Sequence, residues 1–193
     1  MGGRRGGMRS PPRPRPLPSP NLHPFRPYLE ESNDPRWRPL WEQLYRAYFP
    51  TLASAELLPA AGTGQRLGHD VRLRLGVGTE FMVEEKLRPP RPDLANGGAW
   101  DDVLLEFETN GGPKGWVNGT YRTDYFAYLV AAGPWGLVTP WEPLAQAWRW
   151  RGEGWKRRYG VREAHNADYV TRFVCVPLDE LRNAVPTLRR FDL

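Results

Sequence analysis

The first regular pattern in the chain is a stripe of apolar side chains at helical spacing after residue 34. Asn33 or Asp34 can cap a first turn there, and Pro35 suits its first position. Pro50 lacks the N–H that a continuing helix needs. The pattern therefore predicts an amphipathic helix to about residue 49. Its buried stripe comprises Trp37, Leu40, Trp41, Leu44 and Tyr48.

Two segments of alternating polarity follow, at residues 70–75 and 81–88, with Gly76-Val77-Gly78 between them. Alternation on both sides of a short glycine-containing turn predicts a β-hairpin. One face is apolar and carries Val71, Leu73, Leu75, Phe81, Val83 and Leu87, with Glu85 as an acidic exception. The other face carries Asp70, Arg72, Arg74, Met82, Glu84, Lys86 and Arg88.

Two registers keep the apolar faces of this hairpin together. A three-residue loop places Asp70 directly opposite Glu84, so that two carboxylates face each other. A five-residue loop instead pairs Asp70 with Lys86 and Arg72 with Glu84, which are ordinary cross-strand ion pairs. The shorter loop is the commoner hairpin connection and is favoured. Both registers bring Asp70, Glu84 and Lys86 to one face.

The rest of the chain alternates between strand and helix patterns. Strands are expected at 103–109, 125–130, 136–138 and 169–176, and helices at 120–124, after 139 and at 179–184. Thr139-Pro140-Trp141-Glu142 has the form of a capping box, and Trp141, Leu144 and Trp148 would form the buried stripe of the helix that follows. Cys175, in an apolar run, is expected in the core. The pattern predicts a mixed α/β fold.

Charge and composition divide the chain in two. Of 27 basic and 22 acidic side chains, six arginines and no acid lie in residues 1–29, which leaves 21 basic against 22 acidic side chains beyond them. Residues 1–34 are rich in Arg, Gly and Pro and predict a flexible, disordered arm. Residues 35–193 then form one α/β domain. The basic character lies in the arm.

Several classes of protein are disfavoured. A single cysteine and three histidines leave no disulfide framework and little for a zinc site, so a metal would be bound by oxygen. No run approaches the ~18 apolar residues of a membrane-spanning helix, and the arginines near the N-terminus are not followed by the apolar segment of a signal peptide. We therefore expect a cytoplasmic protein without a membrane partner.

The polar face of the hairpin carries a recognisable chemical set. Two carboxylates a few ångströms apart can hold Mg²⁺ through oxygen and leave positions for water and a phosphate oxygen. A neighbouring lysine can orient or deprotonate the attacking water and offset charge that develops on phosphorus. Asp70, Glu84 and Lys86 therefore indicate metal-dependent phosphodiester hydrolysis.

These residues resemble the motif of the PD-(D/E)xK nuclease superfamily. Asp70, a 14-residue step to Glu84 and then Glu84-Glu85-Lys86 carry the resemblance, with a spacing similar to that of Holliday junction resolvases. His69 stands where the proline of the family name would be. Residues 35–180 as a whole also resemble uncharacterised phage-encoded members. The segments concerned are Asp102–Glu106, Gly115-Trp116 and Thr123-Asp124-Tyr125.

The resemblance implies a restriction-endonuclease-like fold, a central mixed β-sheet flanked by helices, and a DNA endonuclease or exonuclease activity. It implies that Asp70 and Glu84 ligate Mg²⁺ or Mn²⁺, that the carbonyl of Glu85 is a further ligand and that Lys86 is catalytic. Glu42 matches by position an acidic residue that some members use as an extra ligand. Whether the substrate is duplex, flap, junction or RNA stays open, and junction cutting would imply a homodimer.

Cations and aromatic residues alternate at 148–159, which favours a nucleic-acid surface, although Trp148 and Trp155 could equally be core residues. The candidate contacts to branched or single-stranded DNA are Arg72, Arg74, Arg88, Arg91, Trp150, Lys156, Arg157 and Arg158. The alternative function is a catalytically inactive nucleic-acid-binding protein of the same fold that uses this surface. A third is an interaction protein whose proline-rich arm docks on a partner.

Overall fold

The computed structural model describes residues 34–59, 67–89, 100–110, 114–119, 121–165 and 169–193. The predicted arm, apart from Asp34, and Arg91 lie outside these residues. The elements are η1 (Pro35–Trp37), α2 (Arg38–Tyr48), β1 (Leu52–Leu57), β2 (Val71–Leu75), β3 (Glu80–Arg88), β4 (Asp102–Asn110), η2 (Trp116–Asn118), β5 (Tyr125–Val130), β6 (Trp135–Pro140), α4 (Trp141–Tyr159), β7 (Arg162–His165), β8 (Val170–Pro177), α5 (Leu178–Ala184) and β9 (Arg189–Asp192).

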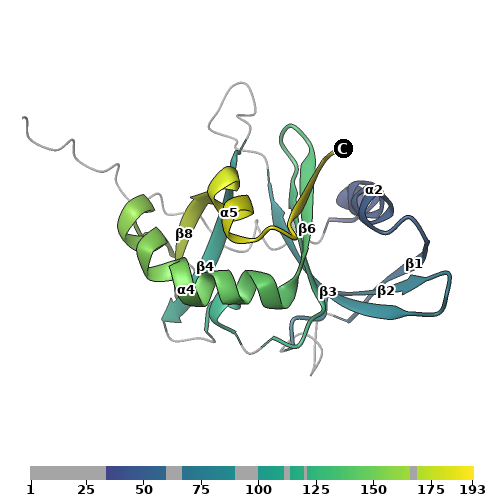
Figure 1. Cartoon of the computed structure of the whole chain (residues 1–193), viewed down its shortest axis with the longest axis horizontal. Coiled ribbons are helices and arrows are strands. Elements are labelled where there is room, and N and C mark those ends of the chain that lie inside the picture. Colours follow the sequence, from purple (N-terminus) through teal and green to yellow (C-terminus); the bar gives the residue numbers. More distant parts are fainter. Residues whose placement is uncertain (1–33, 60–66, 90–99, 111–113, 120, 166–168) are drawn as a thin grey trace, which may run out of the picture.

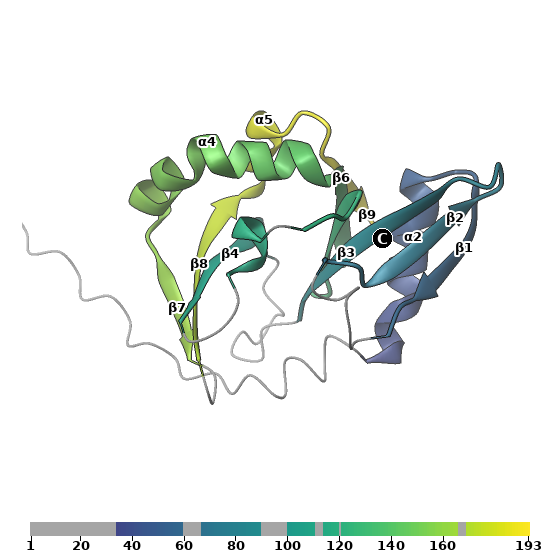
Figure 2. The same ribbon diagram turned by 90° about the horizontal axis from the view of Figure 1, so that it is seen from below.

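The described strands form two sheets (Figure 1). The larger sheet has the order β1-β2-β3-β5-β6-β9, and its neighbours are antiparallel except for the parallel pair β3 and β5. The smaller sheet has the antiparallel order β4-β8-β7. Figure 2 shows α2 beside the larger sheet and α4 across the smaller one. The mixed α/β fold with a mixed sheet flanked by helices is confirmed.

Helix α2 covers one face of the larger sheet because its apolar stripe packs there, as the spacing predicted. Trp41, Leu44 and Tyr45 are buried in a cluster with residues of β2, β3, β5 and β6. The approach to β6 is close, since a Cβ atom on Gly136 would lie 2.6 Å from a methyl carbon of Leu44. Glycine at this position therefore lets the helix rest against the sheet.

Strand β5 lies between the two cores of the protein. Phe126, Tyr128 and Val130 point into a core shared with the smaller sheet, α4 and α5. Ala127 and Leu129 point into the core beneath α2. Side chains alternate between the faces of a strand, so one continuously apolar strand can serve both cores.

The hairpin of β2 and β3 has the three-residue-loop register. Val71 pairs with Val83 and Leu73 with Phe81, and the loop is Gly76 to Gly78. Gly78 has φ of 84°, a left-handed conformation that glycine adopts without steric cost. The predicted three-residue-loop register is therefore the one that forms, and Asp70 lies just before its last pair, Val71 with Val83.

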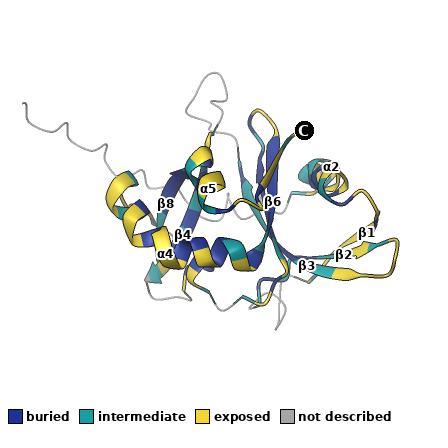
Figure 3. Cartoon of the chain, viewed as in Figure 1, coloured by how far each residue is buried: buried dark blue, intermediate teal, exposed yellow. Residues whose placement is uncertain are grey.

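Helix α4 carries its predicted buried stripe on one side and exposed residues on the other (Figure 3). The predicted capping box does not form, because Thr139 belongs to β6 and Pro140 is the N-cap without a side-chain hydrogen bond. The N–H of Trp141 instead donates to the carbonyl of Asp124 at 2.9 Å. None of the described helices is both long and apolar enough to cross a membrane.

Other elements differ from the sequence prediction. The predicted strand at 103–109 is β4, but it pairs with β8 in the smaller sheet. The short helix expected at 120–124 does not form over the described residues 121–124, and a 3₁₀ turn, η2, lies earlier in the chain. β1, β7 and β9 were not predicted, because each lies at the edge of a sheet and has mostly exposed side chains, so none shows a clear apolar alternation.

Candidate active site

Asp70 immediately precedes β2, and its carboxylate lies at the edge of β3. Its N–H donates to the carbonyl of Val83, and its Oδ2 accepts a hydrogen bond from the N–H of Glu85, each at 2.9 Å. The side chain thus accepts a hydrogen bond where β2 no longer pairs with β3. Because the N–H and C=O of one strand residue point to the same side, the carbonyl of Glu85 also points to the edge where Asp70 lies.

Glu84 and Lys86 lie on one face of β3 and form an ion pair. Glu84 is only 2% exposed, whereas about a third of the Lys86 side chain is exposed. Burial raises the pKa of Glu84 to about 7; Lys86 opposes that shift and Asp70 adds to it. Burial alone would lower the pKa of Lys86, but the carboxylates of Glu84 and Asp70 hold it above its usual range. The three predicted residues are therefore brought together as an electrostatically coupled group.

Glu85 points to the opposite face, as its position in the alternation predicted. Arg38 of α2 holds its carboxylate with two hydrogen bonds of 2.6 and 3.1 Å, and the hydroxyl of Tyr45 donates a third of 2.6 Å. Burial raises the pKa of Glu85, while Arg38 and Tyr45 favour its charged form. These contacts attach the middle of β3 to α2.

Two residues that sequence reasoning did not assign also lie at the site. The ring of Tyr121 packs against Gly68, where a Cβ atom would lie 2.6 Å from the ring and 3.1 Å from Glu84 Oε2. Burial, then the nearby Glu84, raises the pKa of Tyr121 to about 12. Burial also raises the pKa of Glu106 on β4, a shift that nearby Lys86 opposes. Glu106 was recognisable as an acid on the polar side of its strand, whereas no local pattern marked Tyr121.

No family model, curated protein or solved structure matches this chain. Among the described residues, no group of three or more His, Cys, Asp and Glu side chains lies close enough to hold a metal ion. Asp70 and Glu84 are the two carboxylates that interact with each other here, and the function of the site is inferred from their geometry.

The segment that carries Tyr121 is fastened to both sides of the site. The N–H of Arg122 donates to the carbonyl of Leu67 at 2.9 Å, and His69 Nε2 lies 3.0 Å from the carbonyl oxygen of Arg122. At its other end, Asp124 Oδ2 accepts from the N–H of Met82 at 2.7 Å. His69 therefore connects the residues before Asp70 to this segment.

Glu42 is not at this site. Its side chain is more than half exposed and pairs with Arg46, one turn further along α2, at 2.7 Å. The α2 residues that hydrogen-bond to Glu85 on β3 are Arg38 and Tyr45. The structure therefore does not bring Glu42 to the carboxylate pair.

The hairpin arginines that were candidates for nucleic-acid contact are paired with acids. Arg72 contacts Glu56 at 3.3 Å, and Arg74 donates two hydrogen bonds to Glu80. Arg88 is 7% exposed. Its guanidinium pairs with Asp102 and stacks on the partly buried ring of Trp100. Arg88 therefore joins the two sheets in the interior and does not lie on the surface where the sequence predicted a nucleic-acid contact.

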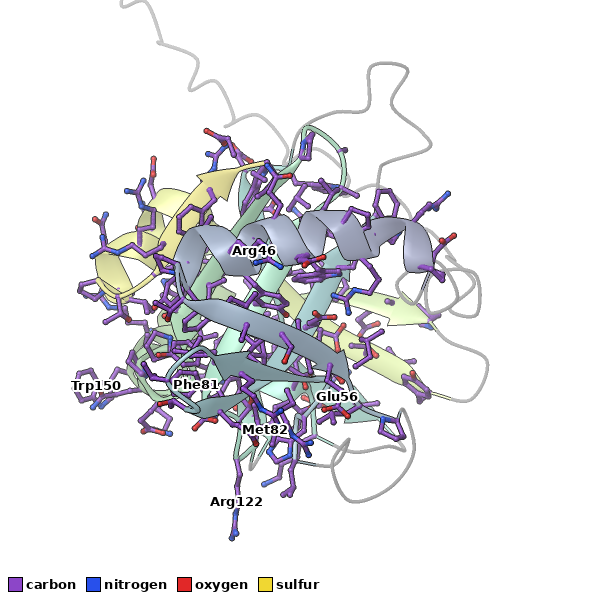
Figure 4. All side chains as sticks on the ribbon, turned by 90° about the vertical axis from the view of Figure 1, so that its right-hand side faces the viewer. Arg46, Glu56, Phe81, Met82, Arg122 and Trp150 are labelled. Carbon is purple, nitrogen blue, oxygen red and sulfur yellow. The ribbon has the colours of Figure 1, made fainter. Side chains whose placement is uncertain are left out.

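Helix α4 divides its aromatic residues between core and surface. Trp148 and Trp155 are buried, whereas Trp150 is 77% exposed and projects from the molecule (Figure 4). Lys156 pairs with Glu153 at 2.6 Å, and its ammonium lies over the buried ring of Phe107. The other predicted contacts, Arg157 and Arg158, are exposed, and Arg158 lies 3.4 Å from Glu180.

Proposed function

We propose that this protein is a metal-dependent nuclease that hydrolyses phosphodiester bonds in DNA, with Asp70, Glu84 and Lys86 as its reactive group. The observation that carries the proposal is that Asp70, just before β2, lies close enough to Glu84 to act on its carboxyl group, while Lys86 pairs with Glu84 on the same face of β3. An opposed pair of carboxylates is unfavourable without a cation. The resemblance of Glu84-Glu85-Lys86 to the PD-(D/E)xK motif supports the same assignment.

The donor set fits Mg²⁺ or Mn²⁺. Asp70 and Glu84 supply carboxylate oxygens, and the carbonyl of Glu85 points to the same strand edge. Mg²⁺ is commonly held by one or two carboxylates together with water and substrate phosphate, so two side chains suffice. A divalent ion here would supply Lewis-acid polarisation of a phosphoryl oxygen.

Lys86 is assigned electrostatic stabilisation. Its ion pair with Glu84 keeps the ammonium charged, and a charged lysine offers three N–H donors and no acceptor. Such a group can hold a phosphate oxygen and offset the negative charge that develops in phosphoryl transfer. A charged ammonium cannot take a proton from water, so we assign Lys86 no role as general base.

The test is cleavage of labelled single-stranded, duplex, flap and four-way-junction DNA, and of RNA, in Mg²⁺, Mn²⁺ or EDTA. We expect metal-dependent cleavage that Lys86→Ala and Asp70→Asn each reduce by about 10²-fold or more. Glu42→Gln is the matched control, because its carboxylate is exposed and away from the site. No cleavage of any substrate by the unchanged protein would overturn the proposal.

The second candidate is a catalytically inactive nucleic-acid-binding protein. It is favoured by the exposed indole of Trp150, which lies two helical turns from the exposed Arg157 on α4. An exposed ring beside cations can stack on an unpaired base. This function predicts salt-dependent DNA binding that Trp150→Ala weakens and Lys86→Ala leaves unchanged, with no hydrolysis.

A further inference from the structure

The ring of Tyr121 has a fixed position beside the carboxylates. Gly68 and Gly119 leave room for it, since Cβ atoms there would lie 2.6 and 3.1 Å from ring carbons. Trp141 packs on it with ring centroids 5.5 Å apart. The hydroxyl makes no hydrogen bond to any residue that the structure describes. A phenol is a good hydrogen-bond donor at neutral pH, so a fixed and unpaired one is available to a ligand.

Arg122 has a fixed backbone and an unpaired side chain. The main chain is held by Leu67 and His69, while the guanidinium extends away from the molecule (Figure 4). Within the described part of the chain, this guanidinium has no ion pair or hydrogen bond. The two arginines of β2 are paired with acids instead, Arg72 with Glu56 and Arg74 with Glu80. Among the residues that the structure describes, Arg122 is therefore a positive charge without an acidic partner, next to Tyr121 in the chain.

Such a pair complements a phosphate backbone. The carboxylates of Asp70 and Glu84 by themselves repel an approaching phosphate, so a polyanionic substrate needs donors and cations close to them. Arginine binds phosphate through a planar fork of N–H groups, and tyrosine hydroxyls are among the groups that hold phosphates in register without reading sequence. Tyr121 lies beside Glu84 and Arg122 follows it in the chain, so the two supply one of each.

We propose that Tyr121 and Arg122 hold the phosphate backbone of the nucleic-acid substrate, with the Tyr121 hydroxyl donating to a phosphate oxygen beside Lys86 and Arg122 pairing with a neighbouring phosphate. The contact rests on the proposed nuclease function and specifies how its substrate is held. Because it involves phosphates, it is independent of base sequence.

The test compares Tyr121→Phe and Arg122→Ala with Arg46→Ala. Phenylalanine keeps the ring packing and removes the hydroxyl alone. Arg46 is a matched control, because it is exposed on α2, far from Arg122 in Figure 4. Fluorescence anisotropy of a labelled single-stranded and a labelled duplex oligonucleotide in EDTA, at several salt concentrations, measures binding, and initial rates in Mn²⁺ give kcat and KM.

We expect Arg122→Ala to raise KM and to reduce the slope of log affinity against log salt by about one, and Tyr121→Phe to lower kcat/KM about tenfold, while Arg46→Ala changes neither. Weaker binding by Arg122→Ala without cleavage by any form would support the contact and reject the nuclease. Cleavage with unchanged kcat/KM and salt slope in both variants would overturn the contact and leave the nuclease standing. Neither binding nor cleavage by the unchanged protein would overturn both.

Discussion

The carboxylate of Asp70 accepts a hydrogen bond of 2.9 Å from the main-chain N–H of Glu85. One acid of the opposed pair is thus held by the backbone of the strand that carries the other. Glu85 is in turn held from its other side by Arg38 and Tyr45. The position of the site therefore depends on the hairpin register and on the attachment of α2 to β3.

Divalent metal should stabilise the protein. A ligand that binds only the folded state at about 100 times its dissociation constant adds about 2.7 kcal/mol to the free energy of unfolding. We expect Mg²⁺ or Mn²⁺ to raise the melting temperature relative to EDTA, and Asp70→Asn to abolish the rise. Differential scanning fluorimetry measures it, with Glu42→Gln as the variant that should respond like the unchanged protein. An unchanged melting temperature across the titration would contradict the metal site.

Glu84 should make the metal-free protein less stable as pH rises. Its folded pKa of about 7 lies above its ordinary value of 4.5, so the folded state holds the proton more tightly than the unfolded state does. The contribution is therefore fully present below about 4.5 and is lost as pH rises toward about 7. Urea unfolding in EDTA should show this loss, at most about 1.4 kcal/mol per pH unit, and Glu84→Gln should flatten it. Equal slopes in the two proteins would refute the assignment.

Removing Arg38 should leave a poorly compensated charge between α2 and β3. Glu85 is mostly buried, and among the described residues its carboxylate would keep only Tyr45 as a hydrogen-bonding partner. We expect Arg38→Ala to lower the free energy of unfolding by about 2–4 kcal/mol, measured in urea. Glu85→Gln in the same chain should restore part of the loss, because it removes the charge. Arg46→Ala, which breaks an exposed pair, should change stability by about 0.5 kcal/mol or less.

Gly68→Ala should disturb the site more than Gly78→Ala does. Both glycines have positive φ, 76° and 84°, so both substitutions introduce similar backbone strain of about 1 kcal/mol. A Cβ atom at Gly78 meets nothing within 4 Å, whereas at Gly68 it meets the ring of Tyr121. Thermal unfolding should therefore show a larger loss for Gly68→Ala, and the cleavage assay a larger loss of activity. Equal effects would mean that Tyr121 does not occupy this position.

Elements that depend on a local pattern could be predicted from the amino-acid sequence alone. The stripe of α2 and the alternation of the hairpin were legible because each buries one face. The three-residue loop decided which residues of β2 and β3 oppose each other. The alternation placed Asp70, Glu84 and Lys86 on one face in either register. The location of Glu85 on the α2 face follows from the same alternation.

Contacts between segments that lie far apart in the sequence could be seen only in the folded structure. Pairing of β4 with β8 put Glu106 in a second sheet that faces Lys86, and the packing of Tyr121 on Gly68 brought a phenol to the site. Arg88 is buried and pairs across the two sheets with Asp102, whereas Glu42 lies at the surface. None of these outcomes has a local signature, because each depends on contacts between residues far apart in the chain, and periodicity within one element carries no information about its partner.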